Sequence, residues 1–181
     1  MRSKQMSVAA LAALISLMLS AAVAGAITAI TCTGTNPCEG TNGIDKIEDS
    51  DGDDVIYGYG GNDDINSWNG GTDEVYGGKG NDDITGYSAV RIYGEDGNDS
   101  LDVGPQTTLL SGGAGDDWLY AENCCGDSSE TTIQGGARDD RIYAADGYPD
   151  VIDCGGGKRD WVEFDRGGVD TVTKCEKKHA R

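Results

Sequence analysis

Aspartates recur along this chain within a glycine-rich pattern, G-G-x-G-x-D-x-U-x, in which U is a large aliphatic residue. The stretch GGKGNDDIT (77–85) is a complete copy. The glycines permit positive φ and let main-chain carbonyls converge where a Cβ would obstruct them. Inward carbonyls with one carboxylate form a hard-oxygen site, which suits calcium rather than zinc or copper. The candidate ligands are the sixth-position aspartates Asp45, Asp54, Asp63, Asp73, Asp82, Asp99, Asp117, Asp140, Asp150, Asp160 and Asp170.

An aliphatic residue follows two positions after each of these aspartates. The series is Ile47, Ile56, Ile65, Val75, Ile84, Leu101, Leu119, Ile142, Ile152, Val162 and Val172. Three further turns keep the aliphatic residue, at Ile92, Leu110 and Ile133, but lack the aspartate. Each turn is expected to have six loop residues and a three-residue strand whose U side chain points inward, because neighbouring side chains of a strand alternate in direction. Fourteen such turns make about seven coils of about eighteen residues.

The repeat resembles the repeats-in-toxin (hemolysin-type) calcium-binding family over about residues 40–173, most fully in GGKGNDDIT and GGAGDDWLY (112–120). The resemblance implies an all-β, right-handed parallel β-roll, a β-solenoid, with several Ca²⁺ ions between successive loops. The two ends of the mature chain are similar to those of small exported bacterial calcium-binding proteins. In the family, loop carbonyls bind calcium beside the aspartate, which implicates Gly61, Gly77, Gly78, Gly80, Gly94, Gly97, Gly112, Gly113 and Gly115.

Alternate turns fall on opposite edges of such a roll, and the two edges differ. The first edge carries an unbroken column, namely Asp45, Asp63, Asp82, Asp99, Asp117, Asp140 and Asp160. The second edge carries Asp54 and Asp73, loses the aspartate within 87–93, 105–110 and the Cys-Cys insertion, and resumes with Asp150 and Asp170. We therefore expect a continuous calcium ladder on the first edge and ions mainly near the two ends of the second.

Departures from the repeat weaken the last sites. Arg138 occupies the fourth position, where glycine is expected, and Tyr148 and Lys158 fall near the same position in two stretches that are out of step by a residue. Sites built on Asp140, Asp150 and Asp160 are accordingly expected to be less secure.

Composition supports a cation-dependent fold. The 181 residues include 29 glycines and 32 acidic against 14 basic residues, for a formal charge of −18. This charge argues against nucleic acid and anionic membranes as partners and favours dissolved cations. Low hydrophobicity with high charge is typical of disorder, but the regular aliphatic positions favour a fold. A self-repelling carboxylate column predicts a chain that is largely unfolded without calcium and is stabilised by calcium through mass action, at about 10⁻⁴–10⁻³ M for extracellular modules.

Residues 1–26 have the pattern of a secretory signal peptide. A basic start, MRSK, precedes the apolar run VAALAALISLML and an A-x-A cleavage pattern at Ala24-Gly25-Ala26. The alternative is an uncleaved membrane anchor. The expected organisation is a signal peptide (1–26), an N-terminal cap (27–39), the β-roll (40–173) and a basic tail (174–181). The sequence thus predicts a secreted, extracellular protein with no membrane span after cleavage.

Six cysteines in an exported chain indicate disulfides. Cys32 and Cys38 bracket a short loop, and Cys154 and Cys175 bracket the last stretch before the tail, which suggests two pairs. The adjacent Cys124 and Cys125 could bridge each other or pair elsewhere, so the connectivity stays open. A zinc site competes poorly, because the chain has no CxxC and its one histidine, His179, lies in the tail.

The predicted function is a calcium-binding structural or adhesive element outside the cell, and not an enzyme. Nucleophilic triads need a positioned histidine, and calcium ligation accounts for the paired carboxylates that a glycosidase would use. The alternative is a cell-surface or glycan-binding module. Tyr57, Tyr76 and Tyr93 follow three U positions and should stack outward as a ladder for a sugar ring or another roll, although cross-strand packing explains them too. An extracellular carbohydrate-active enzyme ranks below both. The family's toxins and proteases carry an effector domain for which this chain has no room.

Overall fold

The computed structural model describes residues 26–34, 37–87, 89–121 and 130–181. All regular secondary structure in these ranges is β-strand, and no helix in them is long and apolar enough to cross a membrane. The predicted signal peptide, apart from Ala26, and the Cys124-Cys125 pair lie outside the described residues.

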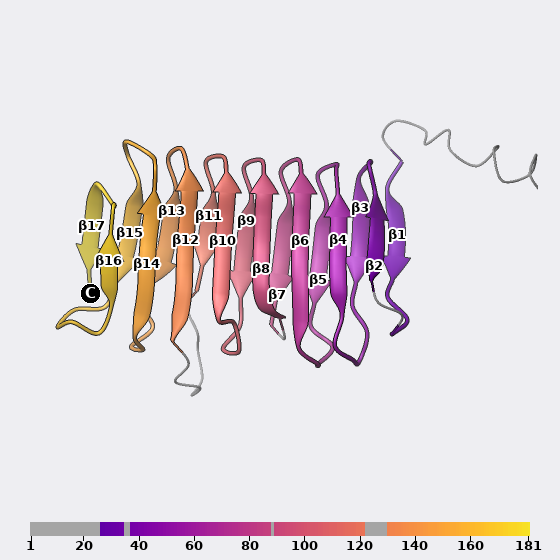
Figure 1. Ribbon diagram of the computed structural model, residues 1–181, viewed down its shortest axis with the longest axis horizontal. Coiled ribbons are helices and arrows are strands. Elements are labelled where there is room, and N and C mark those ends of the chain that lie inside the picture. Colours follow the sequence, from indigo (N-terminus) through magenta and orange to yellow (C-terminus); the bar gives the residue numbers. More distant parts are fainter. Residues whose placement is uncertain (1–25, 35–36, 88, 122–129) are drawn as a thin grey trace, which may run out of the picture.

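Two parallel sheets face each other (Figure 1). The nine-stranded sheet contains, in order, β1 (Thr28–Thr31), β3 (Asp45–Glu48), β5 (Asp64–Ser67), β7 (Asp83–Gly86), β9 (Ser100–Val103), β11 (Trp118–Tyr120), β13 (Arg141–Ala144), β15 (Trp161–Phe164) and β17 (Lys177–Ala180). The eight-stranded sheet contains β2 (Cys38–Thr41), β4 (Val55–Tyr59), β6 (Asp73–Lys79), β8 (Ala89–Asp96), β10 (Leu109–Ala114), β12 (Thr131–Ala137), β14 (Asp150–Gly155) and β16 (Thr171–Thr173).

Successive strands alternate between the two sheets, so the chain winds as a β-solenoid of about eight turns. The predicted all-β parallel fold is confirmed. The extra turn arises because strands at both ends join the sheets: β1 pairs with β3, β2 with β4, and β17 with β15. These three strands come from the segments expected to form a cap and a tail.

The predicted aliphatic positions form the core between the sheets. Ile47, Ile65, Ile84, Leu101, Leu119, Ile142 and Val162 pair strand to strand in the nine-stranded sheet. Ile56, Val75, Ile92, Leu110, Ile133 and Ile152 do the same in the facing sheet, and all thirteen are fully buried. Val172, at the end, is partly buried. Each fully buried side chain contributes roughly 1.5–3 kcal/mol, which holds the coils in register.

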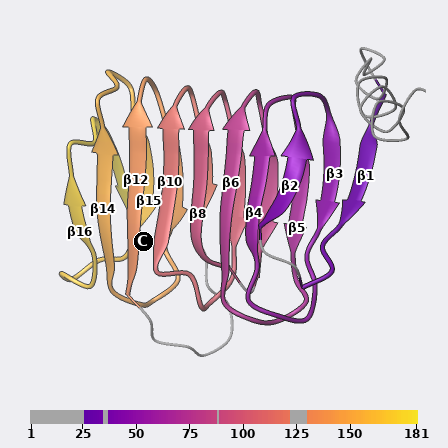
Figure 2. The same cartoon turned by 45° about the vertical axis from the view of Figure 1, so that its right-hand side comes forward.

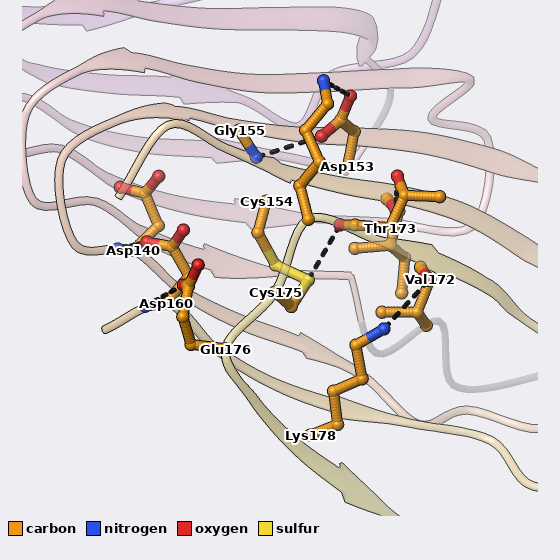
Figure 3. Close-up of a disulfide and its surroundings, with 12 residues drawn as sticks. Asp140, Asp153, Cys154, Gly155, Asp160, Val172, Thr173, Cys175, Glu176 and Lys178 are labelled. Carbon is orange, nitrogen blue, oxygen red and sulfur yellow. Dashed lines mark hydrogen bonds and ion pairs between the residues drawn. A yellow bond between two sulfur atoms is a disulfide. The ribbon is translucent and has the colours of Figure 1, made fainter. Parts of the chain in front are cut away.

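Disulfides join both suggested cysteine pairs. Cys32 bonds to Cys38 next to β2, and Cys154 on β14 bonds to Cys175, just after β16 (Figure 3). The second bond links neighbouring coils across 21 residues of sequence. It therefore fixes the C-terminal end of the solenoid.

The loops gather at two edges. Loops that follow even-numbered strands form the first edge, at the top of Figure 1, and loops that follow odd-numbered strands form the second edge, at the bottom. Figure 2 shows the same separation from another side. Each edge is thus a stack of equivalent loops, which places equivalent side chains of neighbouring coils next to one another.

Candidate metal centres at the two edges

The seven predicted aspartates of the first edge form one hydrogen-bonded column. The backbone N–H of each donates to Oδ1 of the aspartate in the next coil. These bonds are Asp45 to Asp63 (2.9 Å), Asp63 to Asp82 (2.9 Å), Asp82 to Asp99 (2.9 Å), Asp99 to Asp117 (2.9 Å), Asp117 to Asp140 (3.0 Å) and Asp140 to Asp160 (2.9 Å). All seven side chains are at most 2 % exposed. The fold therefore aligns and buries the predicted ligands.

One oxygen of nearly every carboxylate in this column has no partner in the protein. Buried Oδ2 atoms of Asp63, Asp82, Asp99, Asp117, Asp140 and Asp160 accept no hydrogen bond. Burying a charged oxygen without a partner is costly. The first edge thus presents a row of buried acceptors without protein donors, and a bound cation would offset their cost.

The two ends of the column are closed differently. Oδ2 of Asp45 accepts hydrogen bonds from the Thr41 N–H (2.6 Å) and hydroxyl (3.0 Å). At the other end, the Asp160 N–H donates to Oε2 of Glu176 (3.1 Å), beside the Cys154–Cys175 disulfide (Figure 3). Glu176 takes the place of a further aspartate, and the repeat pattern did not indicate this role.

Burial raises the pKa of five first-edge carboxyl groups, those of Asp63, Asp82, Asp99, Asp117 and Asp140. Desolvation is the largest cause, neighbouring acids add to it, and the hydrogen bond from the preceding aspartate's N–H opposes it. The pKa rises to about 6 for Asp63, Asp82 and Asp99. It rises to about 7 for Asp117 and Asp140. Without a cation, part of this column is therefore protonated near neutral pH.

Glycine at the first repeat position leaves space where two oxygens converge. A Cβ on Gly77 would lie 2.5 Å from Asp82 Oδ2 and 2.9 Å from the Gly94 carbonyl oxygen of the next coil. The same pairing of a carboxylate with a next-coil carbonyl occurs at Gly58, Gly94, Gly112 and Gly135. The predicted Gly77, Gly94 and Gly112 thus border candidate sites. Gly58 and Gly135 were missed, although counting five residues back from Asp63 and Asp140 finds them.

The other predicted glycines stack along the same edge. A Cβ at the fourth position would meet the carbonyl oxygen of the preceding coil's fourth position, at Gly61, Gly80, Gly97 and Gly115. Gly80 also has φ +125°, a conformation that favours glycine. At the second position, a Cβ on Gly78 or Gly113 would meet the carbonyl of Tyr59 or Glu95. Main-chain oxygens therefore line the edge beside the aspartates.

A second ladder at the fifth repeat position was not predicted. Side-chain oxygens of Asn62, Asn81, Asn98 and Asp116 each accept the backbone N–H of the fifth residue in the next coil, at 2.9 Å, 2.9 Å, 2.9 Å and 3.1 Å. The sequence signal is the Asn or Asp that directly precedes Asp63, Asp82, Asp99, Asp117 and Asp140. This exposed ladder fixes the spacing of the loops without using the buried carboxylates.

The second edge is interrupted, as predicted. Ala89, Thr107 and Thr131 replace aspartate in its middle. The Thr107 hydroxyl donates to the Ala89 carbonyl (2.9 Å), and the Thr131 hydroxyl donates to the Thr107 carbonyl (3.0 Å). A Cβ on Gly86 would meet the Ile92 side chain rather than oxygens. Among the described residues, Gly86 therefore borders no pair of converging oxygens that could hold an ion.

At the ends of the second edge, hydrogen bonds reach both carboxylate oxygens in two of the four aspartates. Asp73 accepts from the Asp54 N–H (2.9 Å) and the Ser67 hydroxyl (2.6 Å). Asp170 accepts from the N–H groups of Asp150 (2.9 Å) and Asp165 (2.7 Å). Among the described residues, only Asp54 and Asp150 keep an unpartnered oxygen on this edge.

The irregular repeats around Arg138, Lys158 and Tyr148 keep part of the regular loop geometry. Arg138 adopts φ +88° at the fourth position. In the next coil Gly157, and not Lys158, occupies the fourth-position place, since its Cβ would meet the Arg138 carbonyl and Asp160 Oδ1. One extra residue restores the register there, and the N–H groups of Lys158 and Arg159 bond to Asp139 Oδ1. Tyr148 donates its N–H to Asp146 Oδ1 in a second-edge loop (2.8 Å).

The donor set of the first edge fits calcium. Within the described ranges, no three His, Cys, Asp or Glu side chains gather as a metal cluster. Each candidate site instead combines an unpartnered carboxylate oxygen with main-chain carbonyls around a glycine. All-oxygen sites of this kind suit Ca²⁺, while zinc takes nitrogen and sulfur ligands.

A parallel β-solenoid with a buried aspartate column at one edge defines a class of repeat proteins that bind calcium. The family model of the RTX calcium-binding nonapeptide repeat (4 copies) matches residues 39–71, 69–89, 85–107, 107–123 and 126–147. The chain belongs to this family. No curated protein and no solved structure matches it. The aspartate column and both sheets continue past residue 147 to β17.

Proposed function

We propose that this protein binds several Ca²⁺ ions between successive loops of the first edge, from Asp63 to Asp160, and folds when it binds them. The six buried, unpartnered Oδ2 atoms of this edge carry the proposal. Each would be a calcium ligand together with a carbonyl of the next coil, such as Gly94 O beside Asp82. A bound ion would neutralise the column and join two coils.

Calcium binding and folding are coupled in this proposal. A site between two loops requires both coils to be in register, so the unfolded chain lacks it. Ligands that bind only the native state stabilise it by mass action, about 2.7 kcal/mol per site when the ligand is at 100 times its Kd. Adjacent sites share an aspartate column, so binding at one orders its neighbour and makes folding cooperative in calcium.

The proposed setting is extracellular. The signal-like residues 1–26 would be removed on export, leaving residues 27–181. Two disulfides favour an oxidising compartment, and extracellular calcium would load the sites. The role we propose is a rigid, calcium-dependent structural or adhesive element, with no catalytic step.

The test is far-UV circular dichroism of the oxidised chain of residues 27–181 during calcium titration, with magnesium as the control. We expect a sharp gain of β structure with calcium and little with magnesium, because Mg²⁺ dehydrates reluctantly and demands octahedral geometry. Full β structure in chelator at pH 8, where the first-edge carboxylates are ionised, would show that the core and disulfides suffice, and would overturn folding on binding.

Surface recognition by the tyrosine ladder is the second candidate. Tyr57, Tyr76 and Tyr93 stack on the outer face of β4, β6 and β8, with ring centroids 4.9 Å and 4.8 Å apart. Stacked tyrosines of this kind offer an apolar strip with hydroxyl groups along it. Replacing all three by alanine should abolish retention on cell-wall polysaccharide, and unchanged retention would leave them a packing role.

A further inference from the structure

The outer face of β11, β13, β15 and β17 carries aromatic and cationic side chains that the calcium sites do not use. Register pairs place Trp118, Arg141, Trp161 and Lys177 next to one another on these four strands. The column therefore alternates tryptophan and cation, with like residues about 9.5 Å apart. The same column begins with Lys46, Asp64, Asp83 and Ser100 on β3 to β9. Only the C-terminal half of this face has the alternating character.

Aromatic rings make this half of the face a continuous platform. Tyr143, in the adjacent column, lies 5.0 Å from Trp161 and 6.4 Å from Trp118 between ring centroids. Tyr120 stacks on Tyr143 at 4.8 Å. A groove of about 530 Å³ opens over these strands. Its lining combines the aromatic residues Trp118, Tyr143 and Trp161 with three cations and with the carboxylates of Asp116, Asp139 and Asp140. Its size suits a small ligand rather than a protein surface.

Two cations in the groove are free to bind an anion. The Arg141 guanidinium lies 4.6 Å above the Trp118 ring. In the described part of the chain, neither Arg141 nor Lys177 forms an ion pair with a carboxylate. The third cation, Arg159, is paired with Asp139 at 2.6 Å. A strongly acidic protein thus keeps two unpaired cations in this aromatic groove.

An exposed carboxylate at the rim of the groove further restricts which ligands fit. One oxygen of Asp116, Oδ1, accepts the Asp139 N–H, and the side chain remains exposed in the groove lining. A carboxylate there can accept hydrogen bonds from hydroxyl groups of a ligand. The ligand that fits carries ring faces, carboxylates and hydroxyls together.

We propose that this groove binds an acidic oligosaccharide, with uronate carboxylates on Arg141 and Lys177 and sugar rings on Trp118 and Trp161. The polarised C–H groups of a sugar ring meet the negative face of an indole. Arginine can bind a carboxylate through two parallel N–H bonds. Hydroxyl groups of the sugar donate to Asp116. Nucleic acid also combines rings with anions, but DNA lacks the sugar hydroxyl groups that would donate to Asp116.

The test is isothermal titration of the calcium-loaded protein with an oligogalacturonate, at fixed free calcium, with its methyl ester as the matched uncharged probe. We expect the acid to bind and the ester to bind about tenfold or more weakly, because masking the carboxylates removes charge-assisted bonds. Equal binding of both probes would overturn the role of the cations. No binding of either, or tighter binding of an oligothymidylate, would overturn the ligand class.

Matched variants test which residues form the binding site. Arg141→Gln with Lys177→Gln should weaken binding of the acid about tenfold and leave the ester unchanged, whereas Trp118→Ala should weaken both probes. The control is Trp68→Ala, since Trp68 is 61 % exposed in a second-edge loop and Trp118 is 40 % exposed. Loss of acid binding in the Trp68 variant, or retention in the Arg141 and Lys177 variant, contradicts the proposal. Unchanged circular dichroism and calcium response confirm that each variant is folded, so a failure of this site is distinct from a failure of the calcium proposal.

Discussion

The two edges of the solenoid solve the same structural problem with different chemistry. At each edge the loops of successive coils must be held against one another while their main chain is partly buried. The first edge uses buried carboxylates whose Oδ2 atoms have no partner from Asp63 to Asp160. The middle of the second edge uses hydroxyl-to-carbonyl bonds of Thr107 and Thr131, which are complete without an ion. The core and the coil spacing are common to both.

From this difference we infer which part of the repeat would depend on calcium. The aliphatic columns and strand pairing continue through coils where one edge has lost its aspartate, so they do not require a ligand at both edges. Unpartnered carboxylates impose an electrostatic cost that only the first edge bears along its length. We therefore expect calcium dependence to lie in the first edge, so that perturbations at the two edges have separate effects.

The largest effect should come from pH, because it acts on all first-edge carboxylates at once. Burial raises their pKa from 3.8 to about 6 or 7 at Asp82, Asp99 and Asp117. Without calcium, the folded chain then binds more protons than the unfolded chain between about pH 4 and pH 7, so its free energy of unfolding falls as pH rises through this window. In chelator we expect β structure near pH 5 and its loss at pH 8, measured by circular dichroism.

Saturating calcium should reverse this trend. Calcium requires the ionised carboxylates, so protons compete with it and the loaded protein is most stable above the raised pKa values. The control is the same titration in chelator with magnesium added. Parallel pH profiles with and without calcium would contradict the division of roles between the edges.

The next largest effect should follow from removing charge in the first edge. Asp82→Asn with Asp99→Asn keeps an acceptor for the neighbouring N–H but loses two carboxylates. A lost charged ligand is worth about 1.5–3 kcal/mol, so the calcium midpoint should rise by about tenfold to a hundredfold. In chelator at pH 8 the same variant should be more stable than the wild type, because unpaired buried charge is gone. The first effect is measured by calcium titration followed by circular dichroism, and the second by the β signal of each protein in chelator at pH 8.

The matched control is Asp73→Asn on the second edge. Asp73 already accepts hydrogen bonds from Asp54 and Ser67, so its change should lower stability with and without calcium and should not alter the number of ions bound. If Asp73→Asn instead weakened calcium binding and raised stability in chelator, as expected for the first-edge variant, the two edges would be equivalent.

Much of this architecture could be predicted from the sequence, because each signal is local and repeated. A period of nine residues fixes which side chains point inward, and the aspartate positions fix the edge on which each lies. What escaped prediction depends on the neighbouring coil. Glu176 replaces a sixth-position aspartate without belonging to a repeat, and the one-residue insertion at Gly157 restores the register only in three dimensions. The Asn and Asp residues of the fifth-position ladder are evident in the sequence. Their hydrogen bonds were not predicted, because each one joins two different coils.

A smaller effect should follow from filling the space beside one first-edge glycine. Gly77→Ala would place a Cβ 2.5 Å from Asp82 Oδ2 and 2.9 Å from Gly94 O. Overpacking costs about 1–3 kcal/mol, and the methyl group also blocks the ion between these coils. Gly52→Ala on the second edge is the control, since nothing lies within 4 Å of its Cβ. The midpoint temperature of thermal unfolding in saturating calcium should fall for Gly77→Ala only. Calorimetry should count one bound ion fewer in that variant.

The smallest effect should come from the middle of the second edge. Thr107→Val removes the hydroxyl that donates to the Ala89 carbonyl and leaves the shape of the side chain nearly unchanged. Loss of one buried hydrogen bond should lower the free energy of unfolding by about 1 kcal/mol. Because no carboxylate lies in this stretch of the column, the number of calcium ions bound, measured by calorimetry, should stay the same. A lost ion in Thr107→Val would place calcium in the middle of the second edge, and the asymmetry between the two edges would then be one of ligand type and not of occupancy.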